Sequence, residues 1–378
     1  MNFDYNEEQQ LLADSVRRFL AKDYGFESRR KIVASPEGWS AAIWATMAEM
    51  GLTGLPLSPD YGGFGGGAVD MMGVMEAAGD ALLVEPYVAT VGLGAQLVAR
   101  GGTDAQKKQI LPGVAEGKTR LALAQSERDA RYNLAHIATQ ARKAGGGWEL
   151  AGEKRVVLGA PMADRIVVSA RTSGATAEAR GVSLFLVDRA AAGVTLKPYR
   201  TLDEMRAADV MLKGVMVGAD ALIGKEGEAL ALIEEVVDFA TALVCAEAVG
   251  AMKFACDSTL EYLKTRKQFG VPIGTFQALQ HRMVDMYVAY EQAKSMACLA
   301  CSKADSSSDA RDRQRSVSAA KIKIADSCRH ISQEAIQLHG GMGMTEELKV
   351  SHTFRRLTVI AQQFGDADHH LERFAHAA

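Results

Sequence analysis

The sequence lacks an excess of basic charge. Its 378 residues carry 43 Lys and Arg against 46 Asp and Glu, which gives a formal net charge of −3. The basic residues are scattered along the chain and seldom form blocks, so no electropositive footprint for a nucleic acid is present. We therefore expect no nucleic-acid partner and interpret the scattered charges as solvent-exposed helix faces.

Signals of export and of a membrane are also missing. No apolar run approaches the roughly 20 residues that span a bilayer. Asp4, Glu7 and Glu8 stand where a signal peptide needs positive charge. The sequence therefore predicts a cytoplasmic location without a membrane partner.

Cysteine is scarce, and its placement does not indicate a metal site. The five cysteines are all in the C-terminal half: Cys245, Cys256, Cys298, Cys301 and Cys328. The pair Cys298/Cys301 lies in an alanine-rich helical stretch, with neither a second such pair nor a nearby pair of histidines. Buried helix cysteines acting as small apolar residues explain this pattern better than zinc or a redox pair. We expect no metal.

Residues 1–117 are predicted to form an N-terminal helical domain. The first helix begins after Asn6, and its apolar positions recur at helical spacing: Leu11, Leu12, Val16, Phe19 and Leu20. Further helical runs are expected at 39–50, 69–82, 87–100 and 104–111. The glycine-rich segment 62–67 invites interpretation as a phosphate loop, but no strand precedes it and no Gly-Lys-Ser/Thr follows. We interpret it as a loop between helices.

Residues 118–222 change to short β-branched or alternating runs separated by turn residues. The expected strands are 121–124, 155–158, 165–170, 182–187 and 194–196. Because no long helices intervene, this spacing is typical of an antiparallel barrel or sandwich.

Residues 223–378 are predicted to be a C-terminal four-helix bundle. One long helix covers about 230–267, and a second presents a single apolar stripe, which is more often core than cofactor contact: Val317, Ala320, Ile324, Cys328, Ile331, Ala335 and Leu338. Lys303–Arg313 is expected to be a polar loop. The fold class that follows is α+β, mostly helical.

Two C-terminal motifs point to a function. The first runs from Tyr262 to Ile273 and continues at Phe276, Gln277 and Gln280; the second is Gln337–Met344. Both closely resemble signatures of the acyl-CoA dehydrogenase family, and weaker matches occur at 7–10, 59–63 and 222–227. The resemblance covers essentially the whole chain.

The chemistry of these motifs suits a nucleotide. Arg266 offers a planar fork of donors to a pyrophosphate, and Phe269 offers a flat apolar face to adenine. Gly340, Gly341 and Gly343 let the backbone approach a nucleotide closely. The alternative is that Arg266 favourably ends a helix and that the glycines cap the next one. Two motifs together, in family order, favour the nucleotide.

The resemblance implies FAD as cofactor, an acyl-CoA substrate, and an electron-transfer flavoprotein or similar acceptor. In the family this arm comes from a neighbouring subunit and holds the ADP half of FAD, so oligomerisation is implied. The cofactor-binding residues carried over are Ser126, Arg266, Gln268, Phe269, Gln277, Gln337, Gly340 and Gly341.

The family's catalytic base is absent from both positions where the resemblance places it. Phe364 occupies the usual glutamate position, and Ala240 occupies the alternative one on the first long C-terminal helix. Neither side chain accepts a proton. Glu247 and Asp366 are the remaining candidates. Glu247 also suits an internal helix acid with a basic partner, and Asp366 also suits a helix cap or a flavin contact.

The flavin-flanking positions depart from the family as well. The first family signature retains a hydroxyl at Ser126, but Tyr132 and Asn133 replace its Ser-Asp pair. The family's Trp-Ile-Thr element corresponds here to residues 156–158, where Leu158 cannot hydrogen-bond a flavin.

These losses suggest a subunit that completes a partner's active site without keeping its own. The chain resembles the small subunit of two-component acyl-CoA dehydrogenases, of the pimeloyl-CoA and steroid side-chain types. The hypothesis is an α2β2 assembly with the catalytic glutamate on a homologous second subunit. Alternatives are a homomeric dehydrogenase that uses Asp366 or Glu247, a scaffold without flavin, and a flavin monooxygenase. The acyl chain stays open between a dicarboxyl-CoA and a ring-bearing acyl-CoA.

Overall fold

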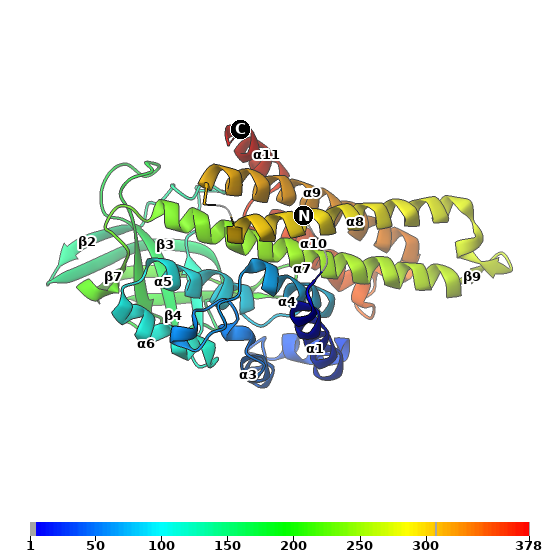
Figure 1. Ribbon diagram of the computed structural model, residues 1–378, viewed down its shortest axis with the longest axis horizontal. Coiled ribbons are helices and arrows are strands. Elements are labelled where there is room, and N and C mark those ends of the chain that lie inside the picture. The colour runs from blue at the N-terminus through cyan, green and yellow to red at the C-terminus, as the bar shows by residue number, and fades with distance from the viewer. Residues whose placement is uncertain (1–4, 307, 378) are drawn as a thin grey trace. The chain divides into compact units, whose positions relative to one another are not determined.

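The chain runs through a helical segment, a β segment and a second helical segment (Figure 1). The structure is a computed structural model that describes residues 5–306 and 308–377. Two compact units each gather distant parts of the sequence. The first unit holds the residues up to Lys31, Ala68–Leu83 and the residues from Thr241 onward, and the second holds Ile32–Gly67 and Val84–Ala240.

The N-terminal helices lie close to where the sequence predicts them, except α2, which was not predicted from the sequence. They are α1 (Glu7–Asp23), α2 (Phe26–Ala34), α3 (Ala41–Glu49), α4 (Ala68–Ala81), α5 (Ala95–Gly101) and α6 (Asp104–Ala115). Asn6 caps α1 in a reciprocal capping box with Gln9, which confirms the predicted start. Leu11 is exposed, so it does not belong to the buried face expected for it.

Between these helices the backbone departs from regular α geometry. The short 3₁₀ turns are η1 (Leu52–Gly54) and η2 (Pro59–Tyr61), and the run predicted at 87–100 begins as a π-helix, η3 (Val88–Gly94). The glycine-rich segment 62–67 connects η2 to α4, which confirms a loop between helical elements.

The β segment, in the second unit, forms one mixed sheet. Its strands are β1 (Leu121–Ala124), β2 (Gln140–Ala144), β3 (Gly147–Leu158), β4 (Arg165–Arg171), β5 (Val182–Asp188), β6 (Val194–Arg200), β7 (Arg206–Gly218) and β8 (Leu222–Ile223). The strand order is β6-β7-β3-β2-β4-β5-β8, with β1 beside β4. The antiparallel prediction is right for most pairs but wrong for β1–β4 and β2–β4, which run parallel.

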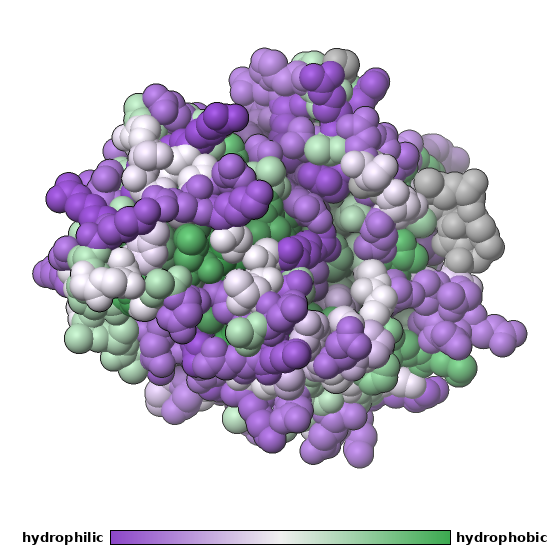
Figure 2. Space-filling model, turned by 60° about the vertical axis from the view of Figure 1, so that its left-hand side comes forward, coloured by the Kyte–Doolittle hydropathy of each residue, from purple (hydrophilic) through white to green (hydrophobic). Residues whose placement is uncertain are grey.

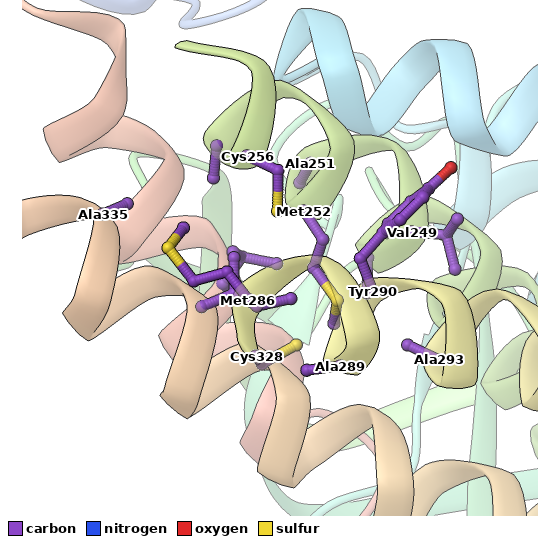
Figure 3. Close-up of a cluster of buried hydrophobic side chains, with 14 of the residues drawn as sticks. Val249, Ala251, Met252, Cys256, Met286, Ala289, Tyr290, Ala293, Cys328 and Ala335 are labelled. Carbon is purple, nitrogen blue, oxygen red and sulfur yellow. The ribbon is translucent and has the colours of Figure 1, made fainter. Parts of the chain in front are cut away.

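The C-terminal segment, mostly in the first unit, consists of three long helices followed by two shorter ones. They are α7 (Leu230–Thr265), α8 (Gln277–Ser306), α9 (Ala310–His339), α10 (Lys349–Gln362) and α11 (Ala367–His376). Side chains of α7, α8 and α9 meet in a buried cluster, where Met252, Met286 and Cys328 lie side by side (Figure 3). All seven residues of the predicted α9 stripe are buried, which confirms its core role.

One prediction about the C-terminal segment is wrong. Lys303–Arg313 is not a loop, because α8 continues to Ser306 and α9 begins at Ala310; Lys303 pairs with Asp312 at 2.7 Å and ties the two helix ends together. Ser307 lies outside the described residues.

One helix in the described part of the chain, α7, is long and apolar enough to cross a membrane by length and composition alone. The share of its most apolar stretch that is buried inside the protein is 89%. The stretch is apolar because α7 is a core helix, and the molecular face in Figure 2 is mainly hydrophilic.

The cysteines have the environment that the sequence predicts. All five are free and buried. Burial raises the pKa of the Cys245 and Cys256 thiols to about 12, so both stay protonated and behave as small apolar groups.

Candidate functional site

The first motif forms an arm that extends beyond the ends of α7 and α8. After α7, strands β9 (Lys267–Gln268) and β10 (Val271–Pro272) pair as a hairpin, whose label lies at one end of the long helices in Figure 1. Phe269 (φ 54°) and Gly270 (φ 82°) form its left-handed two-residue turn. The backbone N–H of Ile273 donates to the carbonyl of Arg266 at 2.8 Å and closes the base of the arm.

The arm presents its functional groups to solvent. Arg266, Gln268 and Gln277 are exposed, and the Phe269 ring is 91% exposed. The ring meets the Phe276 ring edge-on, with centroids 6.1 Å apart, and otherwise buries little surface within the chain. Its exposure leaves the ring available to another molecule.

The second motif follows directly on the end of α9. Gly340 takes φ 58°, and residues Gly340–Met344 form the 3₁₀ turn η6. A methyl group built on Gly340 or Gly341 would meet no described atom within 4 Å, so the backbone there is open to close approach by a ligand. Gln337 is exposed on the last turn of α9.

An aromatic stack joins the two motifs. The rings of Tyr262, on the last turns of α7, and His339, at the end of α9, are stacked with centroids 4.6 Å apart. His339 Nδ1 lies 2.8 Å from the Ala335 carbonyl, which can only accept, so Nδ1 carries the hydrogen. Burial lowers the pKa of His339 and keeps the ring neutral. The stack thereby fixes the start of the arm beside the glycine turn.

This part of the chain fits the ADP half of a dinucleotide. It offers a permanently charged guanidinium, exposed amides, an exposed aromatic face and open glycine backbone, and these are the groups that pyrophosphate and adenine require. The cofactor-binding residues taken from the family resemblance are therefore grouped in the first unit, with one exception. Ser126, the remaining one, lies on the other unit.

Ser126 is exposed at the end of β1 and next to a bulge in β3. Its carbonyl accepts a hydrogen bond from the Arg155 N–H at 2.8 Å. Behind it Glu127 is buried and accepts from Lys154 Nζ, which lies 2.8 Å from both Glu127 Oε1 and Ser169 Oγ. Burial lowers the pKa of Lys154 to about 8. Glu127 therefore anchors the Ser126 loop to the sheet.

The bulge in β3 carries the positions that the resemblance places beside the flavin. Val156 takes φ 51°, an uncommon conformation for a β-branched residue, and is 53% exposed. Asp209 on β7 holds it, accepting from the Val156 N–H at 3.3 Å and from the Tyr199 hydroxyl at 2.9 Å. Leu158, two residues on, offers no hydrogen-bonding group. The bulge is present in this chain, and Leu158 lacks the hydroxyl that the resemblance leads us to expect at this position.

Glu247 lies buried in α7 and forms an ion pair with Arg356 of α10. Arg356 Nε lies 2.6 Å from Glu247 Oε1, and Nη2 lies 2.7 Å from Oε2. Both oxygens of the carboxylate are engaged in this bidentate pair. This geometry matches the structural interpretation of Glu247 as an internal helix acid with a basic partner.

Asp366 caps α11. Its Oδ1 accepts from the backbone N–H of His369 at 2.9 Å, so the alternative interpretation as a helix cap is also present. Phe364 is partly buried in the turn before it, and Ala240 is fully buried in α7. The role of Asp366 or Glu247 as a catalytic base stays a prediction.

Sequence reasoning missed the polar groups that support these positions. They are Lys321 and His370 near the 361–366 turn, Arg356 opposite Glu247, and Asp209 under the β3 bulge. Lys321 carries a usable signal, because it lies on the apolar stripe of α9 one turn after Val317. A charge in such a row indicates a buried polar contact.

Comparison with known proteins identifies the family. Sequence family models for the acyl-CoA dehydrogenase N-terminal, middle and C-terminal domains match residues 6–118, 122–215 and 230–378. The chain belongs to the acyl-CoA dehydrogenase family, whose cofactor is FAD. The exact domain boundaries given from the sequence stay predictions.

Particular relatives match over nearly their whole length. The chain is 33% identical over 367 residues to acyl-CoA dehydrogenase FadE12 of Mycobacterium tuberculosis, which covers 95% of this chain and 93% of that protein. Among solved structures it is similar to a Tcur3481–Tcur3483 steroid ACAD (27% identity, 98% and 97% covered, TM-score 0.87). It is also similar to the FAD complex of PigA (26% identity, 100% and 98% covered, TM-score 0.92).

Proposed function

We propose that the chain is one subunit of a heteromeric acyl-CoA dehydrogenase, in which its arm completes the FAD site of a homologous partner. The reaction is the FAD-dependent α,β-desaturation of an acyl-CoA thioester, with an electron-transfer flavoprotein or similar acceptor. The observation that carries the proposal is the 91% exposed Phe269 ring on a fully built arm, in a chain whose two base positions hold Phe364 and Ala240.

The arm's side chains have separate tasks in such a site. Arg266 neutralises and orients the pyrophosphate through charge-assisted hydrogen bonds. Phe269 covers the adenine face, and the backbone at Gly341 allows close approach. FAD supplies the redox chemistry when bound, whereas these residues supply binding and orientation.

The proton acceptor is assigned to the partner. Both Glu247 oxygens already accept from Arg356, at 2.6 and 2.7 Å, and Asp366 is engaged as a helix cap at 2.9 Å. A general base needs an oxygen within hydrogen-bond reach of the substrate's α-proton. The pairing of a built arm with an occupied carboxylate supports division of labour between two chains.

The test compares this chain purified alone with the same chain co-expressed with the product of its neighbouring gene. FAD per chain is read from absorbance after denaturation, and turnover is read with an acyl-CoA panel and ferrocenium as electron acceptor. We expect bound FAD and activity only in the co-purified complex. A lone chain that is yellow and active would instead support a homomeric dehydrogenase, and a colourless complex would support a scaffold.

The comparisons leave the acyl chain open. FadE12 is named only as an acyl-CoA dehydrogenase, and the Tcur3481–Tcur3483 protein is named as a steroid ACAD. Because of the similarity to a steroid ACAD, ring-bearing acyl-CoA thioesters are tested first in the substrate panel. A dicarboxyl-CoA and straight-chain acyl-CoA thioesters complete it.

A further inference from the structure

Exposed apolar side chains gather near the arm in the first unit. Among the described residues, fifteen large apolar side chains are exposed, and nine of them fall in residues 260–288 and 342–344. Scattered single apolar residues on a surface are ordinary, whereas a contiguous apolar patch marks a site that another molecule covers. The arrangement of these side chains therefore decides whether they form such a site.

Four of the nine side chains lie on one face of the helix pair α7 and α8, which we call the α8 face: Leu260, Val284, Tyr287 and Val288. The three on α8 are three and four positions apart, so they share one side of that helix. The pKa of the Tyr287 hydroxyl is raised, first by Glu291 and less by Asp257 of α7, so Tyr287 lies toward α7. Leu260 follows Asp257 by about one turn and extends the face onto α7.

The α8 face adjoins the arm. Phe276 directly precedes α8, and its ring meets the ring of Phe269, in the turn of the hairpin, with centroids 6.1 Å apart. The hairpin itself comprises only residues 267–272, whereas a stable interface buries roughly 800 Å² and about 20–30 residues on each side. A partner that is reached by the arm therefore needs a larger surface on this chain, and the α8 face is exposed apolar surface next to it.

Charge distinguishes a homologous partner from a second copy of this chain. On α8 the exposed carboxylates Asp285 and Glu291 flank the apolar positions, while Arg282 is already in an ion pair with a carboxylate of α9. On α7 Lys253 is paired with Asp257. A two-fold contact between identical chains presents the same patch from both sides, so the carboxylates of α8 would approach one another. Because like charges across an interface are unfavourable, the α8 face favours a partner with Lys or Arg at the matching positions.

We propose that the α8 face is the docking surface for the homologous partner subunit, which meets it with apolar side chains flanked by Lys or Arg. The inference rests on the proposed function, because it names the surface that brings the partner within reach of the arm. The arm supplies groups to the FAD site, whereas the α8 face holds the two chains together and selects the partner over a second copy.

The test measures the dissociation constant between this chain and the product of its neighbouring gene by sedimentation velocity, at low and at high salt. Val288→Asp is expected to weaken the complex by more than about tenfold, because it places a charge in the apolar part of the face. Glu291→Lys should weaken it by about fivefold at low salt and reduce its salt dependence. Leu371→Asp and Glu372→Lys make the same kinds of change at exposed positions of α11, and they should leave the constant within about twofold.

The variants should fold normally. Val288 is 47% exposed, so the lone Val288→Asp chain should keep the unfolding midpoint of the wild type. Tyr287→Ala is a second variant, which removes apolar contact without adding a charge and should weaken the complex by at least about threefold. An unchanged dissociation constant in both variants would overturn the proposal. It would equally be overturned by a wild-type lone chain that dimerises and becomes monomeric on Val288→Asp, since the face would then bind a second copy.

Arg266→Ala separates this inference from the proposed function. The variant lacks a group assigned to the pyrophosphate but keeps the α8 face, so its complex should lose FAD while the dissociation constant between the chains stays within about threefold of wild type. A wild-type complex that assembles through the α8 face yet holds no FAD would contradict only the proposed function. A complex that holds FAD and turns over, but is unaffected by Val288→Asp and Tyr287→Ala, would contradict only the docking surface.

Discussion

At the scale of single residues, His370 is a buried histidine whose protonation should oppose folding. Its folded pKa of about 2 lies below the ordinary 6.5, because burial and the nearby Lys321, His369 and Arg373 disfavour the charged ring. Between these values the unfolded chain binds a proton that the folded chain does not. Stability therefore rises with pH up to about 6.5 and falls as pH drops below it, by about 1.4 kcal/mol per pH unit from this group.

The measurement is denaturant unfolding of wild type and His370→Gln between pH 5 and 7.5. The variant should lose about that slope, because glutamine does not titrate. His376, which is exposed at the end of α11, provides the control as His376→Gln. Equal slopes in wild type and His370→Gln would contradict the assignment.

A substitution at Glu247 tests whether its carboxylate has a structural or a catalytic role. Its partner Arg356 is buried, so Glu247→Gln leaves a cation without its counter-charge and should cost about 3 kcal/mol of unfolding free energy. Glu261→Gln, on an exposed position of the same helix, should stay within about 0.5 kcal/mol. Urea unfolding checks both. If Glu247 were the base, its variant would also abolish turnover in the complex, whereas a purely structural role predicts that the folded complex keeps most of its turnover.

At the scale of elements, the arm is expected to matter for cofactor binding and not for folding. Phe269→Ala removes a ring that is 91% exposed, so the unfolding free energy of the lone chain should change by no more than about 0.5 kcal/mol. The co-purified complex should lose FAD on dilution several-fold faster, because stacking on the adenine is removed. Leu371→Ala, an exposed apolar change on α11 away from the hairpin, is the control. Unchanged FAD retention would mean that the arm does not reach a cofactor.

Element by element, the sequence predicts local pattern well and long-range polar contacts poorly. The α9 stripe and the start of α1 follow from helical periodicity and a capping box, and both are confirmed. The polar run Lys303–Arg313 was wrongly predicted to be a loop, because charged helix ends and loops have similar compositions. The ion pair between Lys303 and Asp312, which ties the end of α8 to the start of α9, is not visible in the local pattern. Strand direction in β1 and β2 was not predictable, since alternation reports which face is buried and not which strand lies alongside.

In the candidate site, too, local features were predicted and long-range polar contacts were not. Exposed residues of the arm were predicted from motif chemistry, and their exposure fits it. The polar contacts of the 361–366 turn were not predicted, because Lys321 reaches it from α9, 44 residues before its acceptor Gly365. No local pattern encodes such a meeting.

At the scale of the whole molecule, a half-site makes an asymmetric prediction. If this chain lends its arm to a partner and binds no isoalloxazine itself, then the complex should hold one FAD for every two chains. Arg266→Ala should remove most of that FAD, because a phosphate-binding guanidinium contributes about 1.5–3 kcal/mol, roughly tenfold to a hundredfold in affinity. Leu158→Ala, at this chain's own flavin-flanking position, should leave FAD content unchanged. The measurement is flavin absorbance per mole of each chain in the purified complex, with Lys264→Ala, a nearby exposed cation, as control.

A symmetric enzyme would give the opposite pattern: one FAD per chain, and loss of flavin from both Arg266→Ala and Leu158→Ala. The comparison of these two variants therefore discriminates between a lent arm and a complete site without requiring that the acyl substrate be known.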